Sequence, residues 1–170
     1  LAFVQGGTAV LQPEDHEQLR SLGSLFVEPL WLFYREKAAR RVSPSGRLDA
    51  LPQLQGLRVN VGSAGSGVPT LIDKLLQANH LDTQALKVSR LEQTPATVAF
   101  LAGDIDVLVF ASAPESPMVQ MLLQTPGVRL MDFPQNEAYG RRFPFLTPVT
   151  LPRGVVDLAT NVPPADVRLV

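Results

Sequence analysis

The chain has 170 residues, with 15 Lys and Arg against 16 Asp and Glu, and 45% of its residues are hydrophobic. This size and apolar content suit one domain with a substantial core, and the near-neutral charge argues against nucleic-acid binding, which normally uses a basic face. The sequence contains no cysteine, which excludes disulfides, thiolate metal sites and cysteine nucleophiles.

The sequence shows neither a membrane span nor a secretion signal. Its longest apolar stretches, such as residues 105–113, are far shorter than the roughly 20 residues that a transmembrane helix needs. No basic segment precedes an apolar stretch of signal-peptide length. The chain opens on "LAFVQGG", without an initiator Met, as if already inside a fold. We therefore expect a piece of a longer protein.

The first elements are expected to be a short buried strand at residues 1–5 and a polar helix at 13–22. An aromatic strand follows at 24–35, interrupted or bulged at Glu28 and Pro29 because proline cannot donate to a ladder.

Two kinds of side chain stand out in the strand at 24–35. Glu28 is a carboxylate in an apolar run, and burying a charge is costly, so it either faces a cleft or meets an arginine. Trp31, Phe33 and Tyr34 are expected to lie in the core.

Strands and helices then alternate. After a short helix or loop at 48–54, apolar runs predict strands at residues 57–61, 86–91, 105–111, 128–133 and 145–151. Helical patterns fall at residues 68–79, 94–103, 116–124 and 134–141. In the second of these, Thr94 suits the N-cap and Pro95 the first helical position, and Gly103 ends the helix. An extended, proline-broken tail follows the last strand. This order predicts an α/β three-layer sandwich with a mostly parallel sheet. Ligands bind beyond the carboxyl ends of such strands, which selects the loops at 62–68 and 111–116.

The glycine-rich loop in "LRVNVGSAGSGVPT" lacks the catalytic and nucleotide-binding motifs. A P-loop needs Lys and then Ser or Thr after its last glycine, whereas Val68 and Pro69 follow Gly67 here. No window gives the dinucleotide pattern Gly-x-Gly-x-x-Gly, and neither Ser63 nor Ser66 has the spacing of a hydrolase elbow. With no recognisable nucleophile and base pair, we expect no enzymatic activity.

Two interpretations of this loop remain open from its residues. Ser63, Ser66, Gly67 and Val68 would bring hydroxyls and N–H groups to a helix N-terminus, where an anion is stabilised. The same residue types also make a tight strand-to-helix connection in which serine is the N-cap. In either case we expect Gly67 to need backbone freedom or the close approach of a ligand.

The remaining polar residues are expected to be structural or solvated. His16 and His80 suit surface or capping positions, and two histidines without clustered carboxylates make no metal site, so we expect no metal or cofactor. Turn and cap roles are expected for Asp104 and Asp106, at the amino end of a strand. Solvated pairs are expected at Arg40-Arg41 and Arg141-Arg142.

Several stretches in order resemble the TAXI proteins, the extracytoplasmic solute-binding subunits associated with TRAP transporters. They are "LAFVQGGTA", "LGSLFVEPLWLFYRE", "LQGLRVNVGSAGSGVPTLIDKLLQANHLD" and "VAFLAGDIDVLVFASAPESPMVQMLLQTPGVRLMDF". The loop after the G-x-R-V-x-V-G strand is the most specific part, and the G-D-I-D-V strand comes second. Thiamine-precursor and sulfonate-binding receptors share the broad pattern.

The resemblance implies a type II periplasmic-binding-protein fold and a periplasmic or extracytoplasmic location. Residues 1–170 would form a single solute-binding domain, namely the second lobe with its crossing segments, in a chain that lacks the start of the first lobe. Residues 1–8 would end that first lobe, and 145–170 would return toward it.

The implied function is binding of a small anionic solute, such as glutamate or another carboxylate, for delivery to the membrane permease subunits of a TRAP transporter. A ligand-sensing domain of a regulator with the same fold is the alternative. The implied cleft residues are Gln5, Glu28, Ser63, Ser66, Gly67 and Val68, with Ser112, Ala113 and Pro114 opposite. Val68 stands where family members commonly have threonine, which removes one hydroxyl contact, and the proline-rich "SAPESP" loop also departs from the pattern.

Overall fold

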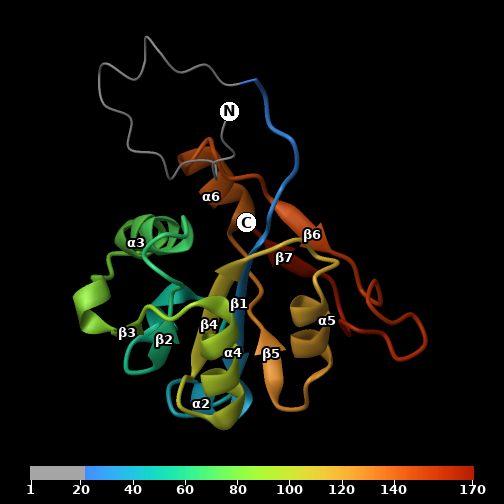
Figure 1. Ribbon diagram of the computed structural model, residues 1–170, viewed down its shortest axis with the longest axis horizontal. Coiled ribbons are helices and arrows are strands. Elements are labelled where there is room, and N and C mark those ends of the chain that lie inside the picture. The colour runs from blue at the N-terminus through green and yellow to red at the C-terminus, as the bar shows by residue number, and fades with distance from the viewer. Residues whose placement is uncertain (1–21) are drawn as a thin grey trace.

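A computed structural model describes residues 22–170 (Figure 1). The strand expected at residues 1–5, almost all of the helix expected at 13–22, and with them Gln5 and His16, lie outside the described residues. Within the described part, no helix has both the length and the apolar character needed to cross a membrane.

A five-stranded sheet forms the middle of the molecule, in the order β3-β2-β4-β1-β5. Its strands are β1 (Leu30–Arg35), β2 (Arg58–Asn60), β3 (Lys87–Ser89), β4 (Val107–Ala111) and β5 (Val128–Leu130). β2 pairs in parallel with β3 and β4, whereas β1 is antiparallel to both β4 and β5. Four strands therefore run in one direction and β1 in the other, which confirms the predicted α/β fold with a mostly parallel sheet.

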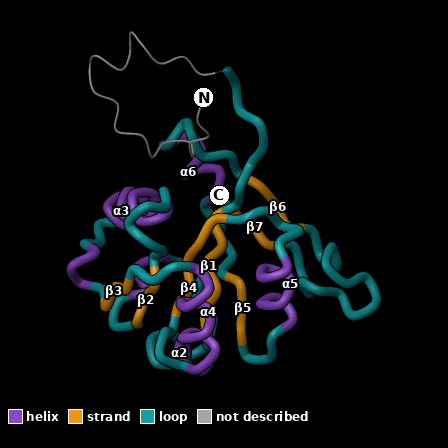
Figure 2. The backbone as a smooth tube through the Cα atoms, in the orientation of Figure 1, coloured by secondary structure: helices purple, strands orange, loops and turns teal. Residues whose placement is uncertain are grey.

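Helices cover both faces of the sheet and give three layers (Figure 2). They are α2 (Glu36–Ala39), α3 (Val68–Ala78), α4 (Gln93–Ala102), α5 (Pro117–Gln124) and α6 (Asn136–Arg142), with 3₁₀ turns at Leu51–Leu54 and Thr83–Ala85. One core packs α2, α3, α6 and the first 3₁₀ turn on one face of the sheet, and a second core packs α4 and α5 on the other.

β1 explains the aromatic run of the sequence. Successive side chains of a strand point to opposite faces, so Leu32 and Tyr34 enter the first core, whereas Trp31 and Phe33 enter the second. All four are at most 3% exposed, because β1 lies between β4 and β5 and is covered on both faces. The predicted core role of the aromatic residues is confirmed.

Two predicted boundaries are wrong for identifiable reasons. The strand begins at Leu30 rather than at residue 24, since Leu30 pairs with Ala111, the last residue of β4, and residues 22–29 have no neighbouring strand to join. Helix α4 is capped by Glu92 and begins at Gln93, so Thr94 is not its N-cap. Pro95 is tolerated in its first turn, where backbone N–H groups lack intrahelical partners.

The C-terminal tail also pairs, which the sequence analysis did not predict. β6 (Val149–Leu151) and β7 (Val167–Leu169) form a two-stranded antiparallel sheet whose Leu151 and Leu169 are buried in the second core. The Val170 carbonyl accepts a 2.7 Å hydrogen bond from the N–H of Leu30. Residues 149–151 and 167–170 therefore pack against the rest of the described residues.

Candidate functional site

The predicted cleft residues within 22–170 gather at one edge of the sheet. β2 and β4 are parallel neighbours, so the loops that follow them, at 61–67 and 112–116, leave from the same edge (Figure 1). β1 runs the other way and starts beside Ala111, which places Glu28 just outside this edge as well. Segments far apart in sequence therefore meet where doubly wound sheets bind ligands.

The loop between β2 and α3 is closed by its own serines. The Ser66 hydroxyl donates to the Ser63 carbonyl over 2.9 Å, and the Ser66 N–H donates to the same oxygen over 3.0 Å. Gly67 occupies the N-cap position of α3 but has no side chain that could accept a hydrogen bond from the helix amides, so the helix N-terminus is uncapped. The interpretation of serine as the N-cap is therefore wrong, because the Ser66 hydroxyl is engaged within the turn.

The first turn of α3 keeps donors without a partner among the described residues. The backbone N–H groups of Gly67, Val68 and Thr70 donate to none of them, and Pro69 has no N–H. The Val68 side chain is 4% exposed and belongs to the first core, so only its backbone can face a ligand.

Gly62, rather than Gly67, is the glycine whose backbone lies in the left-handed region that favours glycine. Gly62 has φ +83°, and a Cβ there would lie 3.0 Å from the Ser66 Oγ. Gly67 has φ −69° and ψ −14°, which any residue adopts. The expectation that Gly67 needs backbone freedom is wrong, and close approach of a ligand remains the reason to expect glycine there.

Replacing Gly62 with alanine is therefore expected to destabilise the loop by about 1–2 kcal/mol, the cost of a left-handed residue with a Cβ. Gly65→Ala is the matched control, because a Cβ at Gly65 meets nothing within 4 Å. Urea denaturation of the two variants tests this difference. Equal stability of the two variants would refute the loop geometry.

Asn60 is a structural residue of this edge that the sequence analysis missed. It ends β2 and is 1% exposed. Its Oδ1 accepts hydrogen bonds from the N–H of Leu91 at 2.8 Å and from the Ser89 hydroxyl at 3.1 Å. Asn60 thus ties the chain leaving β3 to the edge that carries the glycine loop. A lone amide in the apolar run "LRVNVG" was the available signal, since a buried polar group needs partners.

The loop after β4 is also anchored. The indole Nε1–H of Trp31 donates to the Ser112 carbonyl over 2.8 Å, and the N–H of Ser116 donates to the Ala113 carbonyl over 3.0 Å. Glu28 is exposed and forms no ion pair with any described residue. The described residues therefore do not support the alternative in which Glu28 meets an arginine. The other alternative, that Glu28 faces a cleft, stays a prediction.

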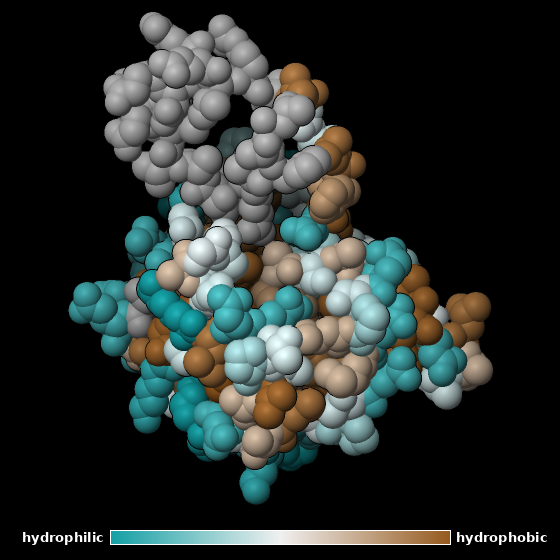
Figure 3. Space-filling view, viewed as in Figure 1, coloured by the Kyte–Doolittle hydropathy of each residue, from teal (hydrophilic) through white to brown (hydrophobic). Residues whose placement is uncertain are grey.

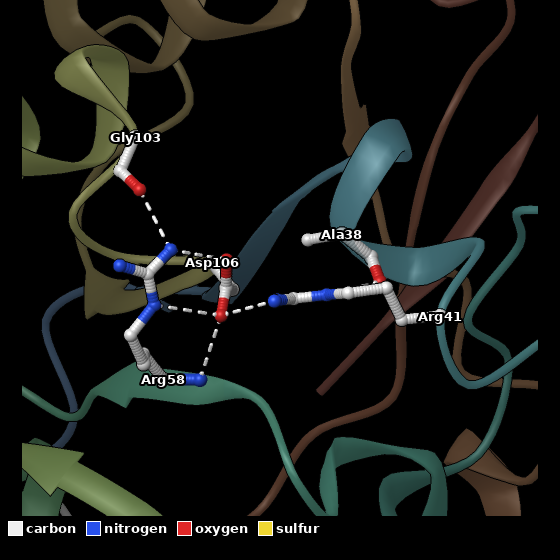
Figure 4. A network of polar contacts seen from close by, with 5 residues as sticks. All are labelled: Ala38, Arg41, Arg58, Gly103 and Asp106. Atoms are coloured by element: carbon white, nitrogen blue, oxygen red, sulfur yellow. Dashed lines mark hydrogen bonds and ion pairs between the residues drawn. The ribbon is translucent and has the colours of Figure 1, made fainter.

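The opposite edge of the sheet holds a buried carboxylate (Figure 4). Asp106, 2% exposed, accepts hydrogen bonds from the backbone N–H, Nε and Nη2 of Arg58 at 3.0, 3.0 and 2.8 Å. Arg41 adds an ion pair at 2.6 Å, and Arg58 Nη2 also donates to the Gly103 carbonyl. Burial raises the pKa of Asp106, but the hydrogen bonds from Arg58 and Arg41 outweigh it and lower the pKa to about 2.

This network corrects two expectations. Asp106 is the centre of an ion-pair network rather than a turn or cap residue, and Arg41 contacts it rather than being only solvated. Because it lies at the amino ends of β2 and β4, away from the glycine loop, we regard it as structural.

Two hollows on the surface of residues 22–170 do not involve the predicted cleft residues. One, of about 390 Å³, is lined by Asp73, Gln77, His80, Leu81 and Asp82 near the end of α3. Another, of about 210 Å³, lies near the carboxyl ends of α4 and α5. Among residues 22–170, no group of three His, Cys, Asp or Glu side chains is arranged to hold a metal ion.

A protein-family profile matches nearly the whole sequence, which establishes the family of this chain. The profile of the NMT1-like family matches residues 4–164. The chain belongs to the NMT1-like family. No curated protein sequence matches this member of the family significantly.

Solved structures similar to this NMT1-like chain include three binding proteins. The periplasmic aliphatic sulphonate-binding protein SsuA of Escherichia coli is 21% identical, with a TM-score of 0.47 over 61% of this chain and 31% of that protein. The alkanesulfonate-binding protein SsuA of Xanthomonas axonopodis pv. citri, bound to MOPS, is 19% identical, with a TM-score of 0.48 over 71% of this chain and 44% of that protein. An ancestral arginine-binding protein bound to arginine is 18% identical, with a TM-score of 0.48 over 71% of this chain and 48% of that protein. The chain thus spans less than half the length of each of them.

Proposed function

We propose that this chain is the ligand-binding second lobe, with crossing segments, of an extracytoplasmic solute receptor of the TAXI type. The receptor binds a small anionic solute, glutamate or a related carboxylate, and delivers it to the permease subunits of a TRAP transporter. It acts in the periplasm or another extracytoplasmic space. Membership of the NMT1-like family and the loop edge of the sheet support this proposal.

The observation that carries the proposal is the uncapped N-terminus of α3 at this edge. The Ser66 hydroxyl is used inside the turn, so it leaves the N–H groups of Gly67 and Val68 available. Helix N-terminal amides and the helix dipole favour a negative charge. The Ser63 hydroxyl, which has no partner among the described residues, supplies a further donor.

Glu28 and the loop after β4 would complete the lobe's side of the cleft. An exposed carboxylate beside an anion site suits a solute that also carries an ammonium group, as an α-amino acid does. The Trp31 hydrogen bond fixes the Ser112 backbone, so Ser112, Ala113 and Pro114 present a rigid wall. Contacts from a first lobe would add to these, and a lone lobe would bind more weakly.

A thermal-shift screen of the intact protein tests the class of solute. Amino acids, dicarboxylates and sulfonates should be compared with neutral and cationic compounds of similar size. We expect only compounds carrying an anionic group to raise the melting temperature, because a ligand that binds the native state stabilises it. Stabilisation by neutral or cationic compounds alone would refute the proposed anion site.

A further inference from the structure

α4 and α5 differ from the other α-helices within residues 22–170 in carrying no charged residue. Their outward side chains form a surface that we name the α4–α5 face. It consists of Thr94, Pro95, Val98, Leu101 and Ala102 on α4 and of Pro117, Met121 and Gln124 on α5. Val98 is 64% exposed, Leu101 45% and Met121 42%, so the large apolar side chains of this face all reach solvent.

α4 and α5 are in contact beneath this face. Gln93 Nε2 and Thr97 Oγ1 on α4 each contact the Met118 sulfur on α5 at 3.2 Å, and both helices pack on the same core. In Figure 3, apolar and pale residues cover much of the front of the molecule, where Figure 1 places α4 and α5. Apolar side chains exposed together on one face are a feature of docking sites.

Charges of opposite sign lie at the two ends of this face. Both helices connect strands that run in one direction, so their amino ends share one edge, where Glu92 and Glu115 precede them. At their carboxyl ends, Arg35 and Lys37 line the 210 Å³ hollow together with Leu101. None of these four charged residues forms an ion pair with another described residue.

We propose that the α4–α5 face is a dimer interface between two copies of this chain, related by a two-fold axis that lies in the plane of the interface and is perpendicular to the helices. Such an axis reverses the helix direction, so Glu92 and Glu115 of each copy meet Arg35 and Lys37 of the other. The uncharged middle then packs against itself without like-charge repulsion. Arg90 and Asp104 flank the two ends of α4 with the reverse polarity, so that the same axis brings Arg90 of each copy toward Asp104 of the other.

The size of the face sets the expected affinity. α4 has 10 residues and is about 15 Å long. An interface built on two such short helices is among the smaller ones, which are weak and transient. We expect a dissociation constant in the micromolar range that rises with salt, because exposed ion pairs are screened.

Sedimentation velocity of the intact protein over a range of concentrations tests the interface. Val98→Lys places like charges near the axis and should weaken the dimer roughly 100-fold, since such a juxtaposition costs several kcal/mol. Its melting temperature at a concentration where all species are monomeric should be unchanged, because Val98 is 64% exposed. Val155→Lys, at a 53% exposed valine between β6 and β7, is the matched control and should leave the dimer intact.

A charge exchange tests the antiparallel arrangement. Glu115→Lys and Lys37→Glu should each weaken the dimer, and the double variant should restore it, because the same ion pair forms with its signs reversed. Three results would overturn the proposal: a wild-type monomer up to about 100 μM, an unaffected Val98→Lys dimer, or no restoration in the double variant. A monomeric wild type with a strongly destabilised Val98→Lys variant would instead show that the same chain covers this face.

Discussion

Replacing Asp106 with asparagine is expected to lower the free energy of unfolding by about 3 kcal/mol at pH 7. The carboxylate is 2% exposed and accepts three hydrogen bonds from Arg58. Hydrogen bonds to charged groups contribute about 1.5–3 kcal/mol, and the neutral amide leaves the guanidinium groups of Arg58 and Arg41 without their counter-charge. Urea denaturation followed by circular dichroism measures the difference.

Asp132→Asn provides a matched control for this substitution. Asp132 pairs with Arg168, but its side chain is 27% exposed and Arg168 is 46% exposed, so the expected loss is at most about 1 kcal/mol. A loss at Asp106 no greater than that at Asp132 would contradict the structural role of the buried network.

The Asp106 network also predicts a specific dependence on pH. Its pKa is lowered from 3.8 to about 2, so the folded state favours the charged form. The corresponding stability is fully present above pH 4 and is lost as the pH falls toward 2, an effect on the order of 2 kcal/mol. The difference in stability between the wild type and Asp106→Asn should therefore shrink between pH 4 and 2. A constant difference over that range would contradict the lowered pKa.

Trp31→Ala is expected to cost about 3–5 kcal/mol, the usual cost of removing a large aromatic side chain from a core. Trp31 is 0% exposed and its ring lies 6.0 Å from that of Phe33 in the second core. Denaturation midpoints of the intact protein measure the loss. A cost below about 1.5 kcal/mol would mean that this core is not packed as described.

Trp31→Phe separates packing from the hydrogen bond. Phenylalanine keeps most of the buried area but cannot donate to the Ser112 carbonyl, a bond of 2.8 Å that contributes about 1 kcal/mol. Hydrogen exchange at residues 112–116 should become faster in this variant, whereas exchange in α3 should not change. Unchanged exchange at 112–116 would show that Trp31 does not hold the loop after β4.

Sequence periodicity predicted most of the sheet and its helices. The one-sided apolar stripe of α3 and the continuous apolar run of β4 are local patterns, and both elements form close to the expected bounds. Boundaries that depend on partners were not predictable in this way. β1 begins beside the end of β4, and β7 forms because it pairs with β6. Neither pairing can be predicted from the residues of one strand alone.

The polar contacts were harder to predict for the same reason. The hydrogen bonds of Arg58 to Asp106 join residues 48 positions apart, and nothing local selects Arg58 from the other basic residues. In the glycine loop, the residue types were consistent with both serine capping and an anion site. Only the three-dimensional structure shows that the Ser66 hydroxyl closes the turn and that Gly62 holds the left-handed backbone conformation.

Titration calorimetry of the intact protein with L-glutamate and with L-glutamine tests most directly whether the uncapped α3 N-terminus binds an anion. The two compounds are nearly isosteric and differ in one carboxylate. We predict that glutamate binds at least about tenfold more tightly, and that Ser63→Ala weakens its binding about tenfold, since a hydrogen bond to a charged group contributes about 1.5–3 kcal/mol. Glutamate binding that is unchanged in Ser63→Ala would contradict an anion site at this loop, whereas equal affinities for the two compounds would mean that the site binds the α-carboxylate that both carry and would contradict its preference for the side-chain carboxylate.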